Sequence, residues 1–365
     1  MACNPTLIHM LASNRWGGIE RYALDICRHF KDAGWDVTAV TRDAVAIDSL
    51  FKKEGISLIS APLRGFSDLV SIKTLATKLR GTPENVIIHV HGCQNAFTAI
   101  MARKWSGKKD VRIIMTRHKV KAASDTILHR FVYRNIDAIV FVSQMVREKF
   151  LSTWEGRHHP FTDTEMHVLH NSLNIPHPEY HQPSYPRPLT AMFHGPLQDG
   201  KGIETIIDAL SLLRGKRIRM KIVGSGRPDY VDRLRQRAIA GGVMEMIDWH
   251  KHTDDPSVLI SMSDFGVLPS VEEEAFGLSN LEYMAGGRPQ ICSSNGAQSE
   301  YITDGCEGFL IPPENPEILA ESITRLALDP NLRSEMGKNA FNTFTGRLSW
   351  GSFISRVEDI YTPSF

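Results

Sequence analysis

The sequence predicts an α/β protein made of two Rossmann-like domains that face each other across a cleft. Three observations lead to this prediction. The chain has 365 residues, above the size at which one hydrophobic core keeps growing, and 42% of them are hydrophobic, enough for two cores. Short β-branched runs alternate with longer amphipathic segments, as in parallel sheets with crossover helices. A proline-rich stretch divides this alternation into two halves.

Six β-branched runs predict the strands of an N-terminal domain at residues 1–175. These runs are LIHMLA, DVTAVT, ISLIS, VIIHVHG, RIIMTRH and AIVFVS. Between the first two, the segment IERYALDICRHF carries apolar residues at helical spacing. It predicts an amphipathic helix that begins directly after Gly17 and Gly18.

The proline-rich stretch, NIPHPEYHQPSYPRPL, has five prolines in sixteen residues and cannot continue a helix or a central strand. We therefore predict an interdomain linker at residues 176–188. A second alternation predicts a C-terminal domain at 189–346, with strands at LTAMFHG, MKIVG, MIDWH, FGVLPS, QICSS and FLIPP. The tail, 347–365, has the periodicity of a helix.

The composition argues against several classes of protein. No run of about eighteen uncharged apolar residues occurs, so no helix is expected to span a membrane. The N-terminus lacks the basic and apolar regions of a signal peptide, and we expect a cytosolic protein. The five cysteines are scattered without a CxxC pair, which predicts neither a disulfide framework nor a zinc site.

Two carboxylates bracket a short predicted helix in residues 269–289, PSVEEEAFGLSNLEYMAGGRP. Glu274 lies beside Phe276 and Gly277, and Glu282 follows after seven intervening residues. A helix N-terminus has unsatisfied amides that hold a phosphate, and nearby carboxylates bind hydroxyls. The pattern indicates binding of a nucleotide-sugar, with the phosphate at the amides of Leu278 and Ser279.

This spacing resembles the signature of family 4 retaining glycosyltransferases (GT4, glycosyl transferases group 1), which have the GT-B fold. The resemblance is strong over residues 191–313 and weaker over the rest of the chain. It implies that Glu274 contacts the hydroxyls of the donor sugar and that Glu282 contacts the ribose. It also implies that the helix at 347–365 crosses back to the first domain.

A basic residue is expected at the donor diphosphate. Lys201 precedes Gly202 at a predicted helix start, after a strand that ends at Gly195, and lysine beside helix amides holds phosphate well. The family usually has Gly-Arg-Leu where this chain has Gly-Pro-Leu, so Pro196 removes a second cation that Arg227 is a candidate to replace. Gly224 follows the next strand, in a loop that faces the nucleotide in the family.

The first domain contributes residues at the carboxyl ends of its strands, where open parallel sheets bind ligands. Gly17 and Gly18 allow backbone amides to approach a ligand, although glycine in such loops often serves geometry alone. In the family this loop lies against the donor phosphate and the acceptor. His118 matches a family position that reaches the donor sugar, and His91 one on the acceptor side; a structural histidine is the alternative for each.

The resemblance implies a hexosyl-type transferase that moves a sugar, with retention, from a UDP- or GDP-linked donor to a hydroxyl of a glycan or lipid-linked acceptor. Surface polysaccharide or lipopolysaccharide biosynthesis is the expected setting, by analogy. No Asp-x-Asp occurs, so we expect no metal and no other cofactor. A nucleotide-sugar epimerase or hydrolase of the same fold, and a non-catalytic sugar-binding relative, are the alternatives.

Charge is divided unevenly, which bears on partners. Residues 1–183 contain 24 Lys and Arg against 17 Asp and Glu, a net +7, and residues 184–365 carry −6. Residues 101–121 hold eight of the cations against one acid, together with Trp105. Cations and Trp favour an anionic membrane surface, so we expect peripheral contact on the inner face of the membrane, with a solvated surface as the alternative. Nothing indicates nucleic acid.

Overall fold

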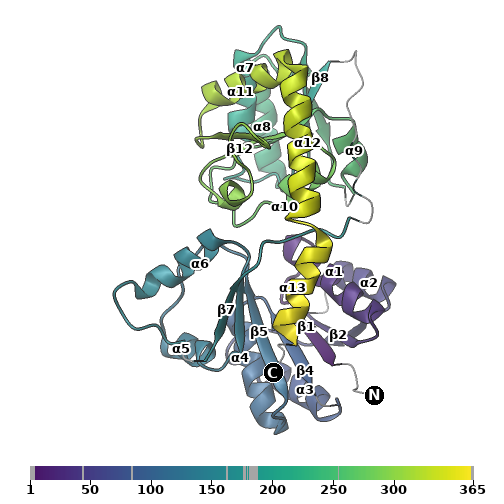
Figure 1. Ribbon diagram of the computed structural model, residues 1–365, viewed down its shortest axis with the longest axis vertical. Helices are drawn as coiled ribbons and strands as arrows, with labels where there is room; N and C mark the ends of the chain where they lie inside the picture. Colours follow the sequence, from purple (N-terminus) through teal and green to yellow (C-terminus); the bar gives the residue numbers. More distant parts are fainter. Residues whose placement is uncertain are drawn as a thin grey trace. The chain divides into compact units, whose positions relative to one another are not determined.

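The computed structural model describes residues 5–42, 45–83, 85–161, 163–175, 178, 180, 188–253 and 255–362. Its internal contacts divide the chain into two compact units (Figure 1). The first comprises Met1–His170 together with Phe353–Phe365, and the second comprises Asn171–Ser352. The predicted linker falls largely outside the described residues.

The first unit is built on a sheet of seven strands in the order β3-β2-β1-β4-β5-β6-β7, and all neighbours are parallel. The strands are β1 (Thr6–Met10), β2 (Asp36–Thr41), β3 (Ser57–Ser60), β4 (Val86–Val90), β5 (Val111–Arg117), β6 (Ala138–Phe141) and β7 (Glu165–Val168). The helices are α1 (Gly18–Asp32), α2 (Val45–Lys53), α3 (Leu69–Arg80), α4 (Cys93–Ser106), α5 (Ile127–Tyr133), α6 (Gln144–Leu151) and the 3-10 helix η1 (Ser152–Trp154).

The chain order of the strands reverses between β1 and β4, so the loops that follow these two strands leave the sheet in opposite directions. Ligands of open α/β sheets bind at such a switch point, beyond the carboxyl ends of the strands. Both strands are buried along their full length, which fixes their register and therefore the position of the loops. His91 follows β4 directly at this edge.

The C-terminal helix α13 (Trp350–Tyr361) contributes its residues from Phe353 onward to the first unit. Tyr361 places its hydroxyl 2.6 Å from Nδ1 of His89 and stacks its ring on Phe30. Arg112 of β5 donates a hydrogen bond to the carbonyl of Ile360. The helix therefore returns to the N-terminal part of the chain, as the resemblance implied.

The second unit has a parallel sheet of six strands in the order β10-β9-β8-β11-β12-β13. The strands are β8 (Leu189–His194), β9 (Ile218–Val223), β10 (Ile247–His250), β11 (Phe265–Leu268), β12 (Gln290–Ser293) and β13 (Gly308–Ile311). The helices are α7 (Ile203–Leu212), α8 (Pro228–Ala240), α9 (Ser257–Ser261), α10 (Leu278–Ala285), α11 (Pro316–Leu328) and α12 (Pro330–Gly346), with the 3-10 helices η2 (Met244–Met246) and η3 (Ala297–Glu300).

The switch point of the second unit lies between β8 and β11. Apolar residues from the strands and from α7, α8 and α11 form one continuous core around this sheet. The loops after β8 and β11 are thereby held at one edge, and they carry Lys201 and Glu274. The structure confirms the predicted α/β class with two parallel sheets, and the strand order explains which predicted residues meet.

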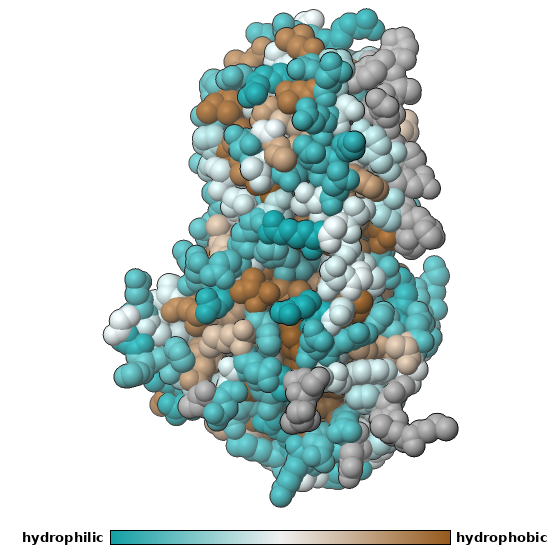
Figure 2. Space-filling model, viewed as in Figure 1, coloured by the Kyte–Doolittle hydropathy of each residue, from teal (hydrophilic) through white to brown (hydrophobic). Residues whose placement is uncertain are grey.

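The surface is mainly hydrophilic on the face shown in Figure 2. No helix of the described residues is both long and apolar enough to cross a membrane. Large apolar side chains are nevertheless exposed at several positions in the first unit, among them Val45, Leu69, Trp105 and Ile127.

Candidate functional site

An ion pair joins the two loops at the switch point of the second unit. Nζ of Lys201 contacts Oε1 of Glu274, and the hydroxyl of Ser270 donates to the same oxygen at 2.8 Å. Both charged side chains are largely buried, with exposed fractions of 22% and 17%. The lysine and the carboxylate predicted for the diphosphate and the donor sugar are thus brought together.

Backbone hydrogen bonds hold these two loops in register. The amides of Val271 and Glu272 both donate to the carbonyl of Gly200, one residue before Lys201. The carbonyl of Glu274 accepts from the amide of Ala297 at 2.9 Å. The ion pair is therefore supported from three loops, which is the kind of preorganisation that electrostatic catalysis requires.

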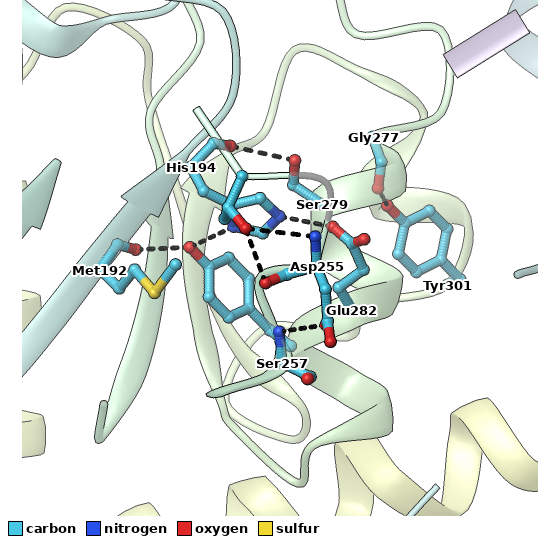
Figure 3. Close-up of polar contacts among 10 residues, drawn as sticks. Met192, His194, Asp255, Ser257, Gly277, Ser279, Glu282 and Tyr301 are labelled. Atoms are coloured by element: carbon cyan, nitrogen blue, oxygen red, sulfur yellow. Dashed lines mark hydrogen bonds and ion pairs between the residues drawn. The ribbon is translucent and has the colours of Figure 1, made fainter. Parts of the chain in front are cut away.

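Glu282 belongs to a second polar cluster, which is shown in Figure 3. Its Oε2 lies 2.5 Å from Nε2 of His194, and Nδ1 of His194 lies 2.8 Å from the hydroxyl of Tyr283. Tyr283 donates its proton to the carbonyl of Met192, so its oxygen accepts from Nδ1–H of His194. A proton must then lie between Nε2 and Glu282, which fixes the carboxylate at the end of β8.

The start of α10 is shaped by residues that the sequence prediction singled out. Gly277 has φ 87°, and a Cβ there would lie 3.0 Å from the side chain of Asn280. Phe276 is buried against the ring of Tyr301, whose hydroxyl donates to the carbonyl of Phe276 at 2.6 Å. Phe276 therefore anchors the helix start through the core.

Ser279 connects the start of α10 to β8, because its hydroxyl donates to the carbonyl of His194 at 3.1 Å (Figure 3). Leu278 and Ser279 are only half-buried, and the first turn of α10 contains no acid. This end of the helix retains the favourable field for a phosphate that the sequence prediction assigned to it.

The loops after β8 and β9 touch through their glycines. A Cβ on Gly224 would lie 2.0 Å from the carbonyl oxygen of Gly195, so no larger residue fits there. Arg227, the candidate for the cation missing at Pro196, lies 3.7 Å from Asp199 of the loop that holds Lys201. It is 69% exposed, and exposed pairs of this kind contribute little stability.

The first unit brings His91 and His118 together. Nδ1 of His91 lies 3.0 Å from Nε2 of His118, and Nε2 of His91 lies 3.2 Å from Nδ1 of His9. Burial lowers the pKa of all three, that of His91 to about 3, and neighbouring histidines lower the pKa of His9 and His118 further. The three rings are therefore a neutral, hydrogen-bonded row.

A fourth histidine, His89, packs against this row, with ring centroids 4.5 Å from His9 and 5.0 Å from His91. Its nitrogens bind the hydroxyls of Tyr361 and Thr116. The ligand atoms of His9, His89 and His91 lie within 4.8 Å of one another, close enough to hold a metal ion. Both nitrogens of His89 are already occupied, however, so the residues present fit a metal poorly.

The Gly17-Gly18 turn faces a carboxylate of its own helix. Backbone amides of Gly17 and Glu20 donate to the side chain of Glu20, and burial raises its pKa. Glu20 is 5% exposed. In this structure the carboxylate of Glu20 therefore accepts hydrogen bonds at the turn where the resemblance implied a donor phosphate.

The basic segment 101–121 does not form one surface. Strand β5 runs through it, so its cations lie at opposite ends of a buried strand. Arg103 and Arg112 form ion pairs with Asp137 and Glu165, and Lys108 donates to backbone carbonyls of residues 82 and 83. Lys104, Trp105 and Lys109 remain exposed at the amino end of β5.

Several residues of these sites were not predicted from the sequence. His194, Tyr283 and Ser270 were missed in the second unit, and His9 and Glu20 in the first. His194 does carry a usable signal, because it ends a predicted parallel strand just before a glycine, as His91 does. The described cysteines are free thiols whose pKa values burial raises, so none is an activated nucleophile.

Comparison with known proteins agrees with both halves of the chain. The family model "Glycosyltransferase Family 4" matches residues 16–176, and "Glycosyl transferases group 1" matches residues 181–343. An uncharacterized glycosyltransferase of Methanocaldococcus jannaschii, MJ1178, is 23% identical over 94% of each chain. A D-inositol 3-phosphate glycosyltransferase of Streptomyces bingchenggensis is 29% identical over 49% of this chain and 41% of its own.

Among solved structures, Alr3699/HepE of Anabaena in complex with UDP and glucose superposes with a TM-score of 0.82 at 17% identity, covering 98% of this chain and 99% of its own. That likeness shows the fold. The two family models lie in tandem over the two sheets, and the relatives are glycosyltransferases. The chain is a glycosyltransferase of the family 4, group 1 type, with the GT-B fold.

Proposed function

We propose that the protein moves a sugar from a UDP- or GDP-linked donor to a hydroxyl of a glycan or lipid-linked acceptor, with retention of anomeric configuration. The observation that carries the proposal is the Lys201–Glu274 pair at the switch point of the second unit. A cation at this position is suited to bind a diphosphate, and a carboxylate beside it is suited to bind a sugar hydroxyl. Since Alr3699/HepE of Anabaena forms a complex with UDP and glucose, a UDP-sugar is the first donor to test.

The proposed roles follow from the contacts of each side chain. Lys201 stabilises the charge that develops on the leaving diphosphate, and Glu274 binds hydroxyls of the donor sugar. Glu282, fixed by His194, binds the ribose. The bond from the anomeric carbon to the diphosphate breaks while the bond to the acceptor oxygen forms on the same face. The proton of the acceptor hydroxyl passes to the leaving diphosphate. The products are the glycosylated acceptor and the protonated nucleoside diphosphate.

The Lys201–Glu274 pair has a mechanistic consequence in this proposal. Each side chain currently satisfies the other, so a bound donor must share Lys201 with Glu274 or displace it. Sharing is favoured, because removing either partner would leave a largely buried charge without compensation. The phosphate of the bound donor then contacts Lys201 while Lys201 keeps its contact with Glu274.

A panel of nucleotide-sugars tests the donor. A ligand that binds only the folded protein raises its melting temperature. We expect one UDP- or GDP-sugar to raise it more than the free nucleoside diphosphate does. Transfer of the labelled sugar to an acceptor, and no release of free sugar without one, distinguishes a transferase from a hydrolase. Stabilisation by no nucleotide-sugar would refute the proposal.

We further propose that the protein works in the cytosol, in polysaccharide or lipopolysaccharide assembly, and contacts the anionic inner membrane surface through Lys104, Trp105 and Lys109. Trp105 is 46% exposed, and lysines near such a surface contribute about 1 kcal/mol each. We expect sedimentation with anionic vesicles at low salt and release at high salt. Binding that persists when Lys104 and Lys109 become Glu would reject this surface.

A further inference from the structure

A pocket of about 400 Å³ lies at the switch point of the first unit. Its walls come from the loop after β1, the start of α1, the start of α4 and the segment that follows β5. His91, predicted on the acceptor side, lines it. The pocket belongs to the first unit alone, so its chemistry can be considered separately from the Lys201 site.

Three cations line this pocket: Arg117, Lys119 and Lys121. The structure pairs none of them with a carboxylate among the residues it describes. Arg117 packs its guanidinium 5.0 Å from the ring centroid of Phe150, and its Nε is buried without a hydrogen-bond partner. Arg117 is half-buried and lines the pocket, so its guanidinium is available to an anion that the ligand supplies.

Backbone amides add to this positive character. Gly92, Cys93, Gln94 and Asn95, the cap and first turn of the 14-residue helix α4, all line the pocket. Gly92 provides no side-chain cap, and the first turn contains no acid. The open N-terminus of α4 therefore favours an anion at the same place as Arg117.

The single carboxylate in the lining does not neutralise the cations. Glu20 is held by the amides of Gly17 and Glu20, at the start of α1. Burial raises its pKa. The remaining lining, including Gln94, Asn95 and Ser124, is able to bind hydroxyl groups.

We propose that this pocket binds an anionic group, a phosphate or a carboxylate, on a sugar or polyol acceptor. Arg117 and the amides at the start of α4 contact the anion, and Lys119 and Lys121 at the rim attract it. The proposal rests on the proposed function in one respect, that the ligand of this pocket is the acceptor. It narrows the acceptor from any hydroxyl compound to an acidic one.

Calorimetry without donor tests the pocket directly, using glucose 6-phosphate, glucuronate and glucose. We expect at least one anionic sugar to bind about tenfold or more tightly than glucose, and the two anionic sugars distinguish phosphate from carboxylate. Arg117→Gln is expected to remove this preference. Lys73→Gln, which removes an exposed lysine of α3, is the matched control and should leave it unchanged.

Lys119→Gln with Lys121→Gln provides a second variant that does not alter the core, because both lysines are exposed. It should weaken the anionic sugar at low salt. Equal affinity for glucose and both anionic sugars, no binding up to about 10 mM, or an unchanged preference in the variants would overturn the proposal. So would competition by UDP, since the anion would then occupy the nucleotide site. Donor binding without anion binding would leave the transferase function standing and reject this pocket.

Discussion

The two units differ in whether the charged side chains at their switch points are paired. In the second unit, each charged group of the candidate site meets its partner: Lys201 contacts Glu274, and His194 shares a proton with Glu282. In the first unit, Arg117 has a buried Nε without an acceptor. The row of His9, which is buried, with His91 and His118, which are half-buried, is neutral.

This difference indicates two ways of preparing a site. Paired charges hold their side chains in position before the ligand binds. Each charge is partly neutralised by its partner, so the ligand must compete with that partner. Unpaired cations keep their full attraction for an anion and reduce the stability of the unit that carries them. We expect the second unit to be sensitive to loss of one partner, and the first to be sensitive to conditions that change its charge.

The largest effect is expected from acid on the first unit. Burial lowers the pKa of His9, His89, His91 and His118 below the unfolded value of 6.5, so the unfolded chain takes up more protons as the pH falls below 6.5. Stability of this unit is full above pH 6.5 and falls below it. With a pKa of about 3, His91 alone accounts for about 1 kcal/mol at pH 5.5, and the other three act in the same direction.

Hydrogen exchange measured by mass spectrometry at pH 7.5 and 5.5, corrected for the intrinsic rate, resolves the two units. Peptides from β4 and β5 should lose protection, and those from β8 and β9 should keep it. His91→Gln should reduce the pH dependence, and His158→Gln, an exposed control, should not. Equal loss in both units would contradict the assignment to the buried histidines.

The next effect concerns the paired charges of the second unit. Lys201→Ala should lower the rate of transfer by on the order of a hundredfold, because it removes the cation at the diphosphate and leaves Glu274 without its partner. The fold should survive. Lys216→Ala, an exposed lysine in the turn before β9, is the matched control. Near-normal turnover of Lys201→Ala in an initial-rate assay would place the diphosphate elsewhere.

Sequence patterns predicted the fold and the types of residue in the candidate site better than they predicted which of these residues contact one another. Alternating strands and helices identified both sheets, and the seven-residue spacing placed Glu274 in the loop before α10 and Glu282 within that helix. Contacts between distant segments were not accessible, because they depend on strand order. His194 meets Glu282 across 88 residues, and Arg117 lines a pocket with residues of the first loop. A sequence also does not show which cations form ion pairs. We predicted one basic surface for segment 101–121, although β5 separates its cations.

A smaller effect separates the two carboxylates of the second unit. Glu282→Ala should weaken binding of the free nucleoside diphosphate by about tenfold, since its carboxylate is assigned to the ribose. Glu274→Ala should mainly slow transfer. His194→Gln should resemble Glu282→Ala, because His194 positions that carboxylate. Calorimetry with the free nucleoside diphosphate, with exposed Glu273→Ala as control, measures the difference, and equal loss of affinity in both variants would refute the division.

The smallest effect is expected from metal removal, and here both units lead to the same prediction for different reasons. In the second unit, Lys201 and the start of α10 supply the positive charge that a metal would otherwise provide at a diphosphate. In the first unit, a metal at His9, His89 and His91 would have to displace the hydroxyls of Tyr361 and Thr116 from His89. The initial rate should therefore be unchanged in excess EDTA. A complete loss of activity that added metal restores would show that a cation completes one of the two sites, and separate titrations of nucleotide and acceptor with that metal would identify which.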